Sequence, residues 1–314
     1  MFNYFKFIQT LVSFSPRQFF GETKTAHFII SLLEKYQVPF YLQRFSLQLP
    51  LIKKAVLKAD GKILACAGCC YVGGKIIGKD KIISSLLSSI ICQTESNINF
   101  NPKCPAVSPG NHYFAPAVAV THKGLVKILK AKDVQGKVIV RSVRHQAANI
   151  LVGNQKNPRY VCFAHYDSIK KGALDNASGV SVLMGTILAS PCTLKNTLYV
   201  FSACEELSYE KPIYRGYGYR IFEKQYHHLL KQVKKVIVLE CVGDGPVQIL
   251  DDPKMIELGF PIKDLTKLMD KIRVVTGDFE HCMTIYHSDL DDGRGLKKKF
   301  LQETQSALLE EMRA

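Results

Sequence analysis

The sequence of 314 residues lacks a long uninterrupted apolar run. Its longest apolar stretches, such as Ile82 to Cys92, are interrupted by serines and fall short of the roughly 20 residues that cross a bilayer. The amino terminus has a short mixed apolar stretch with one lysine and no small-x-small cleavage motif after it, which predicts the first helix of the fold rather than an export signal. We therefore expect no transmembrane helix, no membrane partner and a cytoplasmic location.

Acidic residues are comparatively scarce, with 27 Asp and Glu against 42 Lys and Arg and a formal net charge of +15. Such an excess can serve nucleic-acid binding, but the lysines are scattered and form only short clusters such as Lys297 to Lys299. No nucleic-acid-binding motif accompanies them. The charge pattern therefore favours a solvated basic surface, and no nucleic-acid partner is expected.

The sequence has 10 cysteines, and without an export signal we expect them to stay reduced. Cys66, Cys69 and Cys70 form a C-x-x-C-C cluster, which suits a redox pair or half of a zinc site. Because no second C-x-x-C completes it, the interpretation as ordinary buried or surface thiols is favoured.

Apolar periodicity predicts an α/β fold. A helix is expected within residues 23–36 and a strand over 41–51, and an alternation of strands and helices resumes at residue 138. The strands expected there are 138–141, 148–152, 160–164, 197–203, 236–239 and 283–286, and the helices are 177–189, 217–232 and 296–312. This order predicts a mixed, mostly parallel central sheet flanked by helices.

Residues 53–137 have a different sequence pattern, with short β-like runs, glycine turns and a proline-rich stretch at 101–116. We interpret this segment as a β-rich inserted subdomain. Residues 1–52 and 138–314 would then form the main domain, and the 47% of hydrophobic residues are enough to bury a sizeable core.

Polar side chains follow the predicted strands at the points where they stop. These side chains are His165, Glu205 and Glu206, Glu240 and His287, and Asp175 lies in a loop before a helix. Ligands of such sheets sit at the carboxyl ends of strands, so these groups should meet at one edge. Singly, each has an ordinary explanation, such as a helix cap for Asp175. Together, buried carboxylates and imidazoles predict a cation site that suits Zn²⁺.

The ordered motifs carry a family resemblance. They are Ala-His-Tyr-Asp-Ser (164–168), Gly-Ala-Leu-Asp-Asn-Ala-Ser-Gly-Val (172–180), Glu-Glu (205–206), Leu-Glu-Cys-Val-Gly (239–243) and Tyr-His-Ser-Asp-Leu-Asp (286–291). The set resembles family 28 of the metallopeptidases, in clan MH, whose members include di-zinc aminopeptidases and glutamate carboxypeptidase. Glutaminyl cyclases and the transferrin receptor are relatives. The resemblance covers at least residues 148–293, and Ser-Pro-Arg at 15–17 is similar to the family's start.

The resemblance implies a zinc-peptidase fold of the phosphorylase/hydrolase type and a site with two zinc ions. Asp175 would bridge the ions, with His165 and Glu240 completing one and Glu206 and His287 the other. Glu205 would be the general base. Asp167 would hold the ring of His165, Asp291 would do the same for His287, and the bond between Asp175 and Asn176 would be cis. The implied activity is aminopeptidase hydrolysis of a peptide or aminoacyl substrate.

Two departures from the family pattern leave alternatives open. The family position of Glu240 is usually Asp, and Asp244 is a possible substitute ligand. The segment between Gly243 and His287 is also short, which leaves the substrate pocket undefined. A zinc acyltransferase similar to glutaminyl cyclase and an inactive, receptor-like binding protein are therefore alternatives. Cobalt or manganese could replace zinc, and the sequence predicts neither side-chain specificity nor oligomeric state.

Overall fold

The computed structural model describes residues 2–86, 95–211 and 213–313. Within these ranges, no helix combines the length and the apolar character that crossing a membrane requires. The apolar stretch 82–92 lies partly outside the described residues. The chain divides into two compact units, one of Met1–Leu47, His145–Cys282 and Asp292–Ala314, the other of Gln48–Arg144 and Met283–Asp291.

The first unit is built on a mixed sheet. Its strands follow the order β12-β13-β11-β9-β10-β8-β1. They are β1 (Phe40–Ala59), β8 (Val134–Gly153), β9 (Tyr160–His165), β10 (Thr197–Ser202), β11 (Lys235–Leu239), β12 (Gln248–Leu250) and β13 (Ile272–Thr276). Strands β9, β10, β11 and β13 pair in parallel, whereas β8 and β12 are antiparallel to their neighbours β10 and β13. The predicted mixed, mostly parallel α/β class is confirmed.

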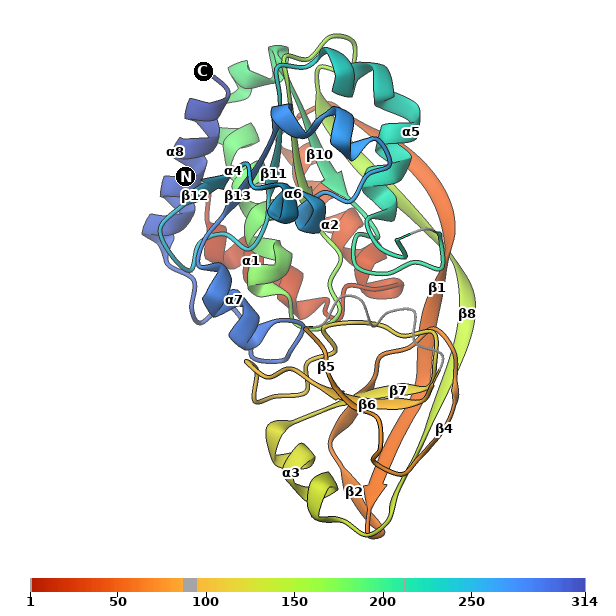
Figure 1. Cartoon of the computed structure of the whole chain (residues 1–314). Helices are drawn as coiled ribbons and strands as arrows, with labels where there is room; N and C mark the ends of the chain where they lie inside the picture. Colours follow the sequence, from red (N-terminus) through yellow and green to blue (C-terminus); the bar gives the residue numbers. More distant parts are fainter. Residues whose placement is uncertain (1, 87–94, 212, 314) are drawn as a thin grey trace. The chain divides into compact units, whose positions relative to one another are not determined.

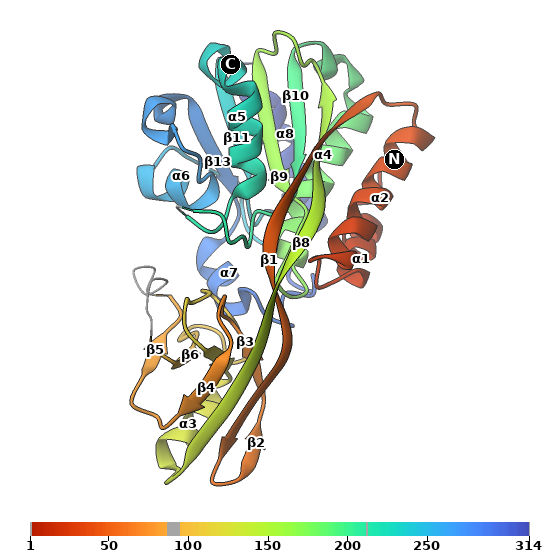
Figure 2. The same cartoon turned by 90° about the vertical axis from the view of Figure 1, so that its right-hand side faces the viewer.

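Helices cover both faces of this sheet (Figures 1 and 2). They are α1 (Tyr4–Ser13), α2 (Phe20–Lys35), α4 (Ser178–Ala189), α5 (Tyr217–Gln232), α6 (Pro253–Gly259) and α8 (Lys298–Glu311). The short helix α7 (Phe279–Ile285) follows β13 in the chain. Successive residues of β9 point to opposite faces. The ring of Phe163 packs against Phe222 of α5 at 5.0 Å and against Phe260 just after α6 at 4.8 Å. Its neighbour Cys162 faces Met312 at the end of α8, with 3.8 Å between the sulfurs. The strands are thus buried on both sides, which keeps their carboxyl ends fixed.

The second unit contains a smaller sheet of order β3-β7-β6-β5. Its elements are β2 (Lys62–Leu64), β3 (Cys66–Gly68), β4 (Gly74–Ile77), β5 (Ile82–Ser84), β6 (Asn97–Phe100), β7 (Ala117–Val120) and α3 (His122–Lys130). Its apolar core includes Cys69, Cys70 and Val118. Cys69 and Cys70 are buried free thiols and Cys66 is a partly buried one, which agrees with their interpretation as ordinary thiols.

Three predicted strands differ from the structure. The strands expected at 138–141 and 148–152 are parts of the single strand β8, because its polar middle keeps an alternation of exposed and more buried residues. The strand expected at 283–286 is wrong. That segment belongs to helix α7, whose start is capped by Asp278, since its Oδ1 accepts the backbone N–H of His281 at 3.0 Å. The parallel strand beside β11 is instead β13, which the periodicity did not reveal.

Candidate metal centre

The carboxyl edge of the parallel strands gathers the predicted polar residues of the first unit. His165 is the last residue of β9, Glu206 lies just beyond the end of β10, and Glu240 directly follows β11. Asp175 lies in the helical turn Ala173–Ala177 that leads into α4. Because β9, β10 and β11 pair in parallel, their carboxyl ends lie at one edge.

The ligand atoms of these residues lie close together. His165 Nε2 is 3.2 Å from Asp175 Oδ1 and 3.4 Å from Glu240 Oε1. His165, Asp175 and Glu206 each offer an atom within 4.8 Å of the others, and Asp175, Glu240 and Cys241 form a second group of this kind. For zinc bonds to nitrogen and oxygen, a tetrahedron has edges of about 3.3 Å. The measured distances match such edges, so these residues fit zinc.

The electrostatics of the site point the same way. Burial alone would lower the pKa of His165, but Glu240, Asp167 and Asp175 hold it well above its usual value. Burial raises the pKa of Glu240, with the charge of His165 opposing the shift. Several carboxylates thus share one imidazole as their nearby positive charge. Such a concentration of buried negative charge is costly without a cation.

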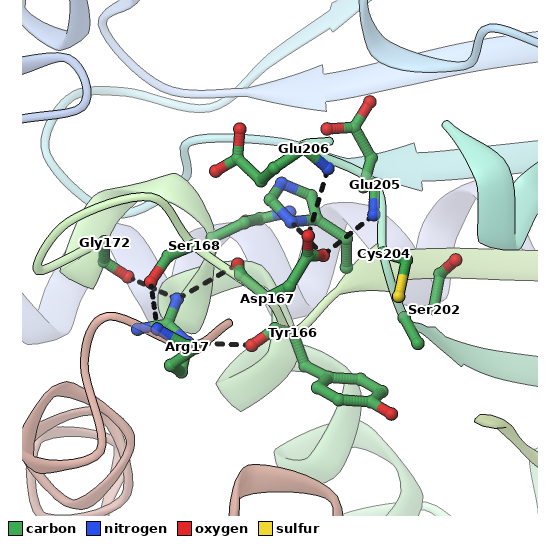
Figure 3. A network of polar contacts seen from close by, with 12 residues as sticks. Arg17, Tyr166, Asp167, Ser168, Gly172, Ser202, Cys204, Glu205 and Glu206 are labelled. Carbon is green, nitrogen blue, oxygen red and sulfur yellow. Dashed lines mark hydrogen bonds and ion pairs between the residues drawn. The ribbon is translucent and has the colours of Figure 1, made fainter. Parts of the chain in front are cut away.

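The carboxylate of Asp167 contacts the backbone of both Glu205 and Glu206 (Figure 3) and also faces the ring of His165. Its Oδ1 and Oδ2 accept the backbone N–H groups of Glu205 and Glu206, each at 3.0 Å. Its Oδ1 also lies 3.4 Å from His165 Nδ1. Because Nδ1 faces this carboxylate, Nε2 is the ring nitrogen on the side of Asp175 and Glu240, and it is the atom that would bind a metal ion in place of its proton.

Glu205 is buried beside this network. Burial raises its pKa to about 8, although the positive charges of His165 and Arg215 oppose the shift. Arg215 Nη1 lies 3.4 Å from Glu205 Oε1. The carboxyl group is therefore poised to exchange a proton near neutral pH, as a general base requires.

The glutamate at position 240 is held on both oxygens. Its Oε1 faces His165, and its Oε2 accepts a hydrogen bond of 3.3 Å from Asn176 Nδ2. The Asp175–Asn176 peptide bond is cis, as the resemblance implied. Asp244 instead accepts the backbone N–H of Asp278 at 3.0 Å and faces His281 Nδ1 at 3.1 Å. It therefore supports the start of α7, and Glu240 is the residue grouped with Asp175.

His287 belongs to the second unit and follows a helix rather than a strand. It is buried, and its Nδ1 lies 3.0 Å from the carbonyl oxygen of Pro109. When Nδ1 of His287 carries the proton and donates it to the Pro109 carbonyl, Nε2 keeps its lone pair. Neutral imidazole binds metals through such a lone pair. Asp291 is also buried in this unit. The roles of both residues stay predictions.

Arg17 is a fully buried residue whose contacts could not be predicted from the sequence. Its guanidinium donates hydrogen bonds to the carbonyl oxygens of Tyr166 at 2.7 Å, Lys171 at 2.9 Å and Gly172 at 2.8 Å. These carbonyls belong to the segment between His165 and Asp175 (Figure 3). Arg17 thereby fixes the loop between two candidate ligands. The only signal for it was the Ser-Pro-Arg motif, because backbone carbonyl partners leave no trace in a sequence.

Comparisons with known proteins agree with this geometry. Residues 147–250 match Peptidase family M28. A zinc aminopeptidase from Bacillus subtilis has a similar structure, with a TM-score of 0.69 and 15% identity, over 100% of this chain and 95% of that one. An aminopeptidase from Aneurinibacillus sp. strain AM-1 is also similar, with a TM-score of 0.61 and 14% identity, over 98% of this chain and 92% of that one. No curated protein matches significantly in sequence.

A glutaminyl cyclase from Tannerella forsythia also shares the fold, with a TM-score of 0.53 and 13% identity, over 99% of this chain and 98% of that one. At such identities the structures establish the fold alone. The match to the family covers the segment that contains His165, Asp175, Glu206 and Glu240. The predicted resemblance to metallopeptidase family 28 is therefore confirmed over residues 147–250.

Proposed function

We propose that the protein is a zinc-dependent exopeptidase that removes amino-terminal residues from peptides or aminoacyl substrates in the cytoplasm. The observation that carries this proposal is the convergence of His165, Asp175, Glu206 and Glu240 at one sheet edge, with distances typical of metal ligands. The match to Peptidase family M28 supports hydrolysis of peptide bonds.

The residues present would hold two zinc ions. In the first unit, His165 and Glu240 would bind one ion, Glu206 would bind the other, and Asp175 would contact both. The role of His287, which lies in the second unit, stays a prediction from the resemblance. Bound zinc would lower the pKa of a water molecule in the site and would polarise the carbonyl group of the bond to be cleaved. Cys241 lies beside Asp175 and Glu240, with one potential ligand atom of each residue within 4.8 Å of the others.

Glu205 is the proposed general base. Its carboxylate accepts a proton from the attacking water and later gives it to the leaving amine, which requires a pKa near the working pH. Arg215 restrains this carboxylate from one side. Asp167 acts as a positioning residue, because it fixes the ring of His165 and the backbone of Glu205 through one carboxylate.

A zinc acyltransferase activity of the glutaminyl cyclase type is the second candidate. The shared fold with the cyclase from Tannerella forsythia supports it. The site retains an acidic residue at every position that the resemblance assigns to a carboxylate, which favours a two-metal hydrolase. A receptor-like binding protein is the third candidate, and the bound metal content distinguishes it from both enzymes.

The test combines metal analysis of the purified protein with assays of aminoacyl amides and of peptides that begin with glutamine. Wild type should contain zinc and release free amino acids. Glu205→Gln should lose about 10²–10⁴-fold in rate while keeping its zinc. Glu303→Gln, an exposed change on α8, is the matched control. Pyroglutamate as the main product would favour the cyclase, and a protein without metal or activity in the presence of added zinc would favour the binding protein.

A further inference from the structure

A second group of potential ligands lies in the first unit outside the candidate metal centre. Glu22 comes from α2, His145 from β8, and Cys204 from the chain just after β10. Each offers one atom within 4.8 Å of the others, and all three side chains are buried. Three separate elements thus bring an oxygen, a nitrogen and a sulfur to one point.

The measured distances suit a tetrahedral ion. His145 Nε2 is 3.2 Å from Glu22 Oε2, and Cys204 Sγ is 3.4 Å from the same oxygen. With zinc bonds of about 2.0–2.1 Å to nitrogen and oxygen and about 2.3 Å to sulfur, tetrahedral edges are about 3.3 Å and about 3.6 Å. Hydrogen bonds explain each pair separately. These two hydrogen bonds do not require Cys204 Sγ to lie near a ring nitrogen of His145. In this structure the two atoms are nevertheless within 4.8 Å of each other.

The charge around the group favours a cation. Burial raises the pKa of Glu22, His145 opposes the shift, and the nearby carboxylate of Asp167 raises it further. A divalent ion would offset the negative charge of both carboxylates. The ring of His145 is held in place by an edge contact with Phe19, whose centroid is 5.6 Å away.

A cavity of about 440 Å³ adjoins the group and provides access. Glu22 and His145 line it together with Tyr166 and Arg44. An ion held by three protein ligands needs a fourth, and a water molecule from this cavity can supply it. The side chain of Cys204 points away from the carboxylates of Glu205 and Glu206 (Figure 3).

We propose that Glu22, His145 and Cys204 form a binding site for a divalent cation of the zinc type, separate from the candidate metal centre. Nitrogen, oxygen and thiolate sulfur are a ligand set for such ions. On binding, a metal–sulfur bond replaces the S–H bond of Cys204, and the proton goes to the solvent. The site would join α2, β8 and the segment before Glu205. The proposal does not depend on the proposed peptidase activity.

The test is titration of the metal-free, full-length protein with Co²⁺, followed by the charge-transfer absorption that arises only when a thiolate binds the ion. Wild type should show this band, and Cys204→Ser should lose it. Cys241→Ser is the matched control, because Cys241 is the thiol grouped with Asp175 and Glu240. That variant should keep the band.

Absence of the band in wild type, its persistence in Cys204→Ser, or its loss in Cys241→Ser would overturn the proposal. Far-ultraviolet circular dichroism checks the fold of each variant. If Cys204→Ser does not fold, the same Co²⁺ titration of His145→Gln tests the proposed site instead. A band that is lost or needs more Co²⁺ in His145→Gln supports the site, and an unchanged band refutes it.

Discussion

Replacing Arg17 with methionine should destabilise the protein strongly. The side chain is fully buried and donates to the carbonyls of Tyr166, Lys171 and Gly172. Hydrogen bonds from a charged donor contribute about 1.5–3 kcal/mol each, or about 4.5–9 kcal/mol for the three together. Removing the buried charge recovers several kcal/mol of desolvation free energy. We therefore expect the free energy of unfolding to fall by about 3–5 kcal/mol.

The assay is urea unfolding of the metal-free protein, followed by far-ultraviolet circular dichroism. With a slope of about 3 kcal/mol per molar urea, the midpoint of Arg17→Met should drop by about 1–1.7 M. Arg17→Lys should drop nearly as far, because an ammonium group cannot serve three carbonyls arranged around a planar fork. Arg141→Met, at an exposed position of β8, is the control. An equal midpoint for Arg17→Met and this control would refute the reasoning.

Three further changes have defined outcomes. Asp167→Asn should lower zinc affinity or activity by about 10–100-fold, measured against Asp270→Asn, because it weakens the bond that orients a ligand imidazole. Burial lowers the pKa of His112 to about 3, with His287 adding to the shift. The folded protein therefore favours the neutral form of the His112 ring. The stability that this form contributes is complete above the ordinary pKa of 6.5 and decreases as the pH falls toward 3. Between pH 7 and pH 5 the wild type should lose about 2 kcal/mol more in urea unfolding than His112→Asn, and equal losses would contradict this. Asp252→Ala should lower stability by about 1 kcal/mol in thermal unfolding, because the side chain caps the start of α6, and an unchanged melting temperature would exclude the capping role.

The parallel part of the fold was predictable from local patterns. Helix α5 spans the predicted residues 217–232, and the strands 160–164 and 236–239 were each found within one residue. Buried parallel strands are continuous apolar runs, and polar residues at their ends share one edge. These two rules were enough to bring His165 and Glu240 together.

The remaining features depend on contacts that the sequence does not show. Residues 283–286 carry β-branched and aromatic side chains, but the cap at Asp278 starts a helix before them. Strand β13 is short and contains a charged Arg273, so its pattern was weak. The partners of Arg17 are backbone atoms about 150 residues away, and no pattern in side chains encodes such bonds.

The group of Glu22, His145 and Cys204 escaped the sequence analysis for a related reason. The three residues come from a helix, an antiparallel strand and a strand-end segment, and no short motif contains two of them. Only the folded chain places their ligand atoms together.

The most direct test of the metallopeptidase account is the rate of aminoacyl amide hydrolysis as zinc is added to the metal-free protein. We predict no hydrolysis before zinc is added and a rate that rises to a plateau. Glu240→Gln should need more zinc to reach its plateau, because an amide replaces a charged ligand oxygen. A metal-free protein that hydrolyses the amides as fast as the zinc-loaded protein would contradict the account.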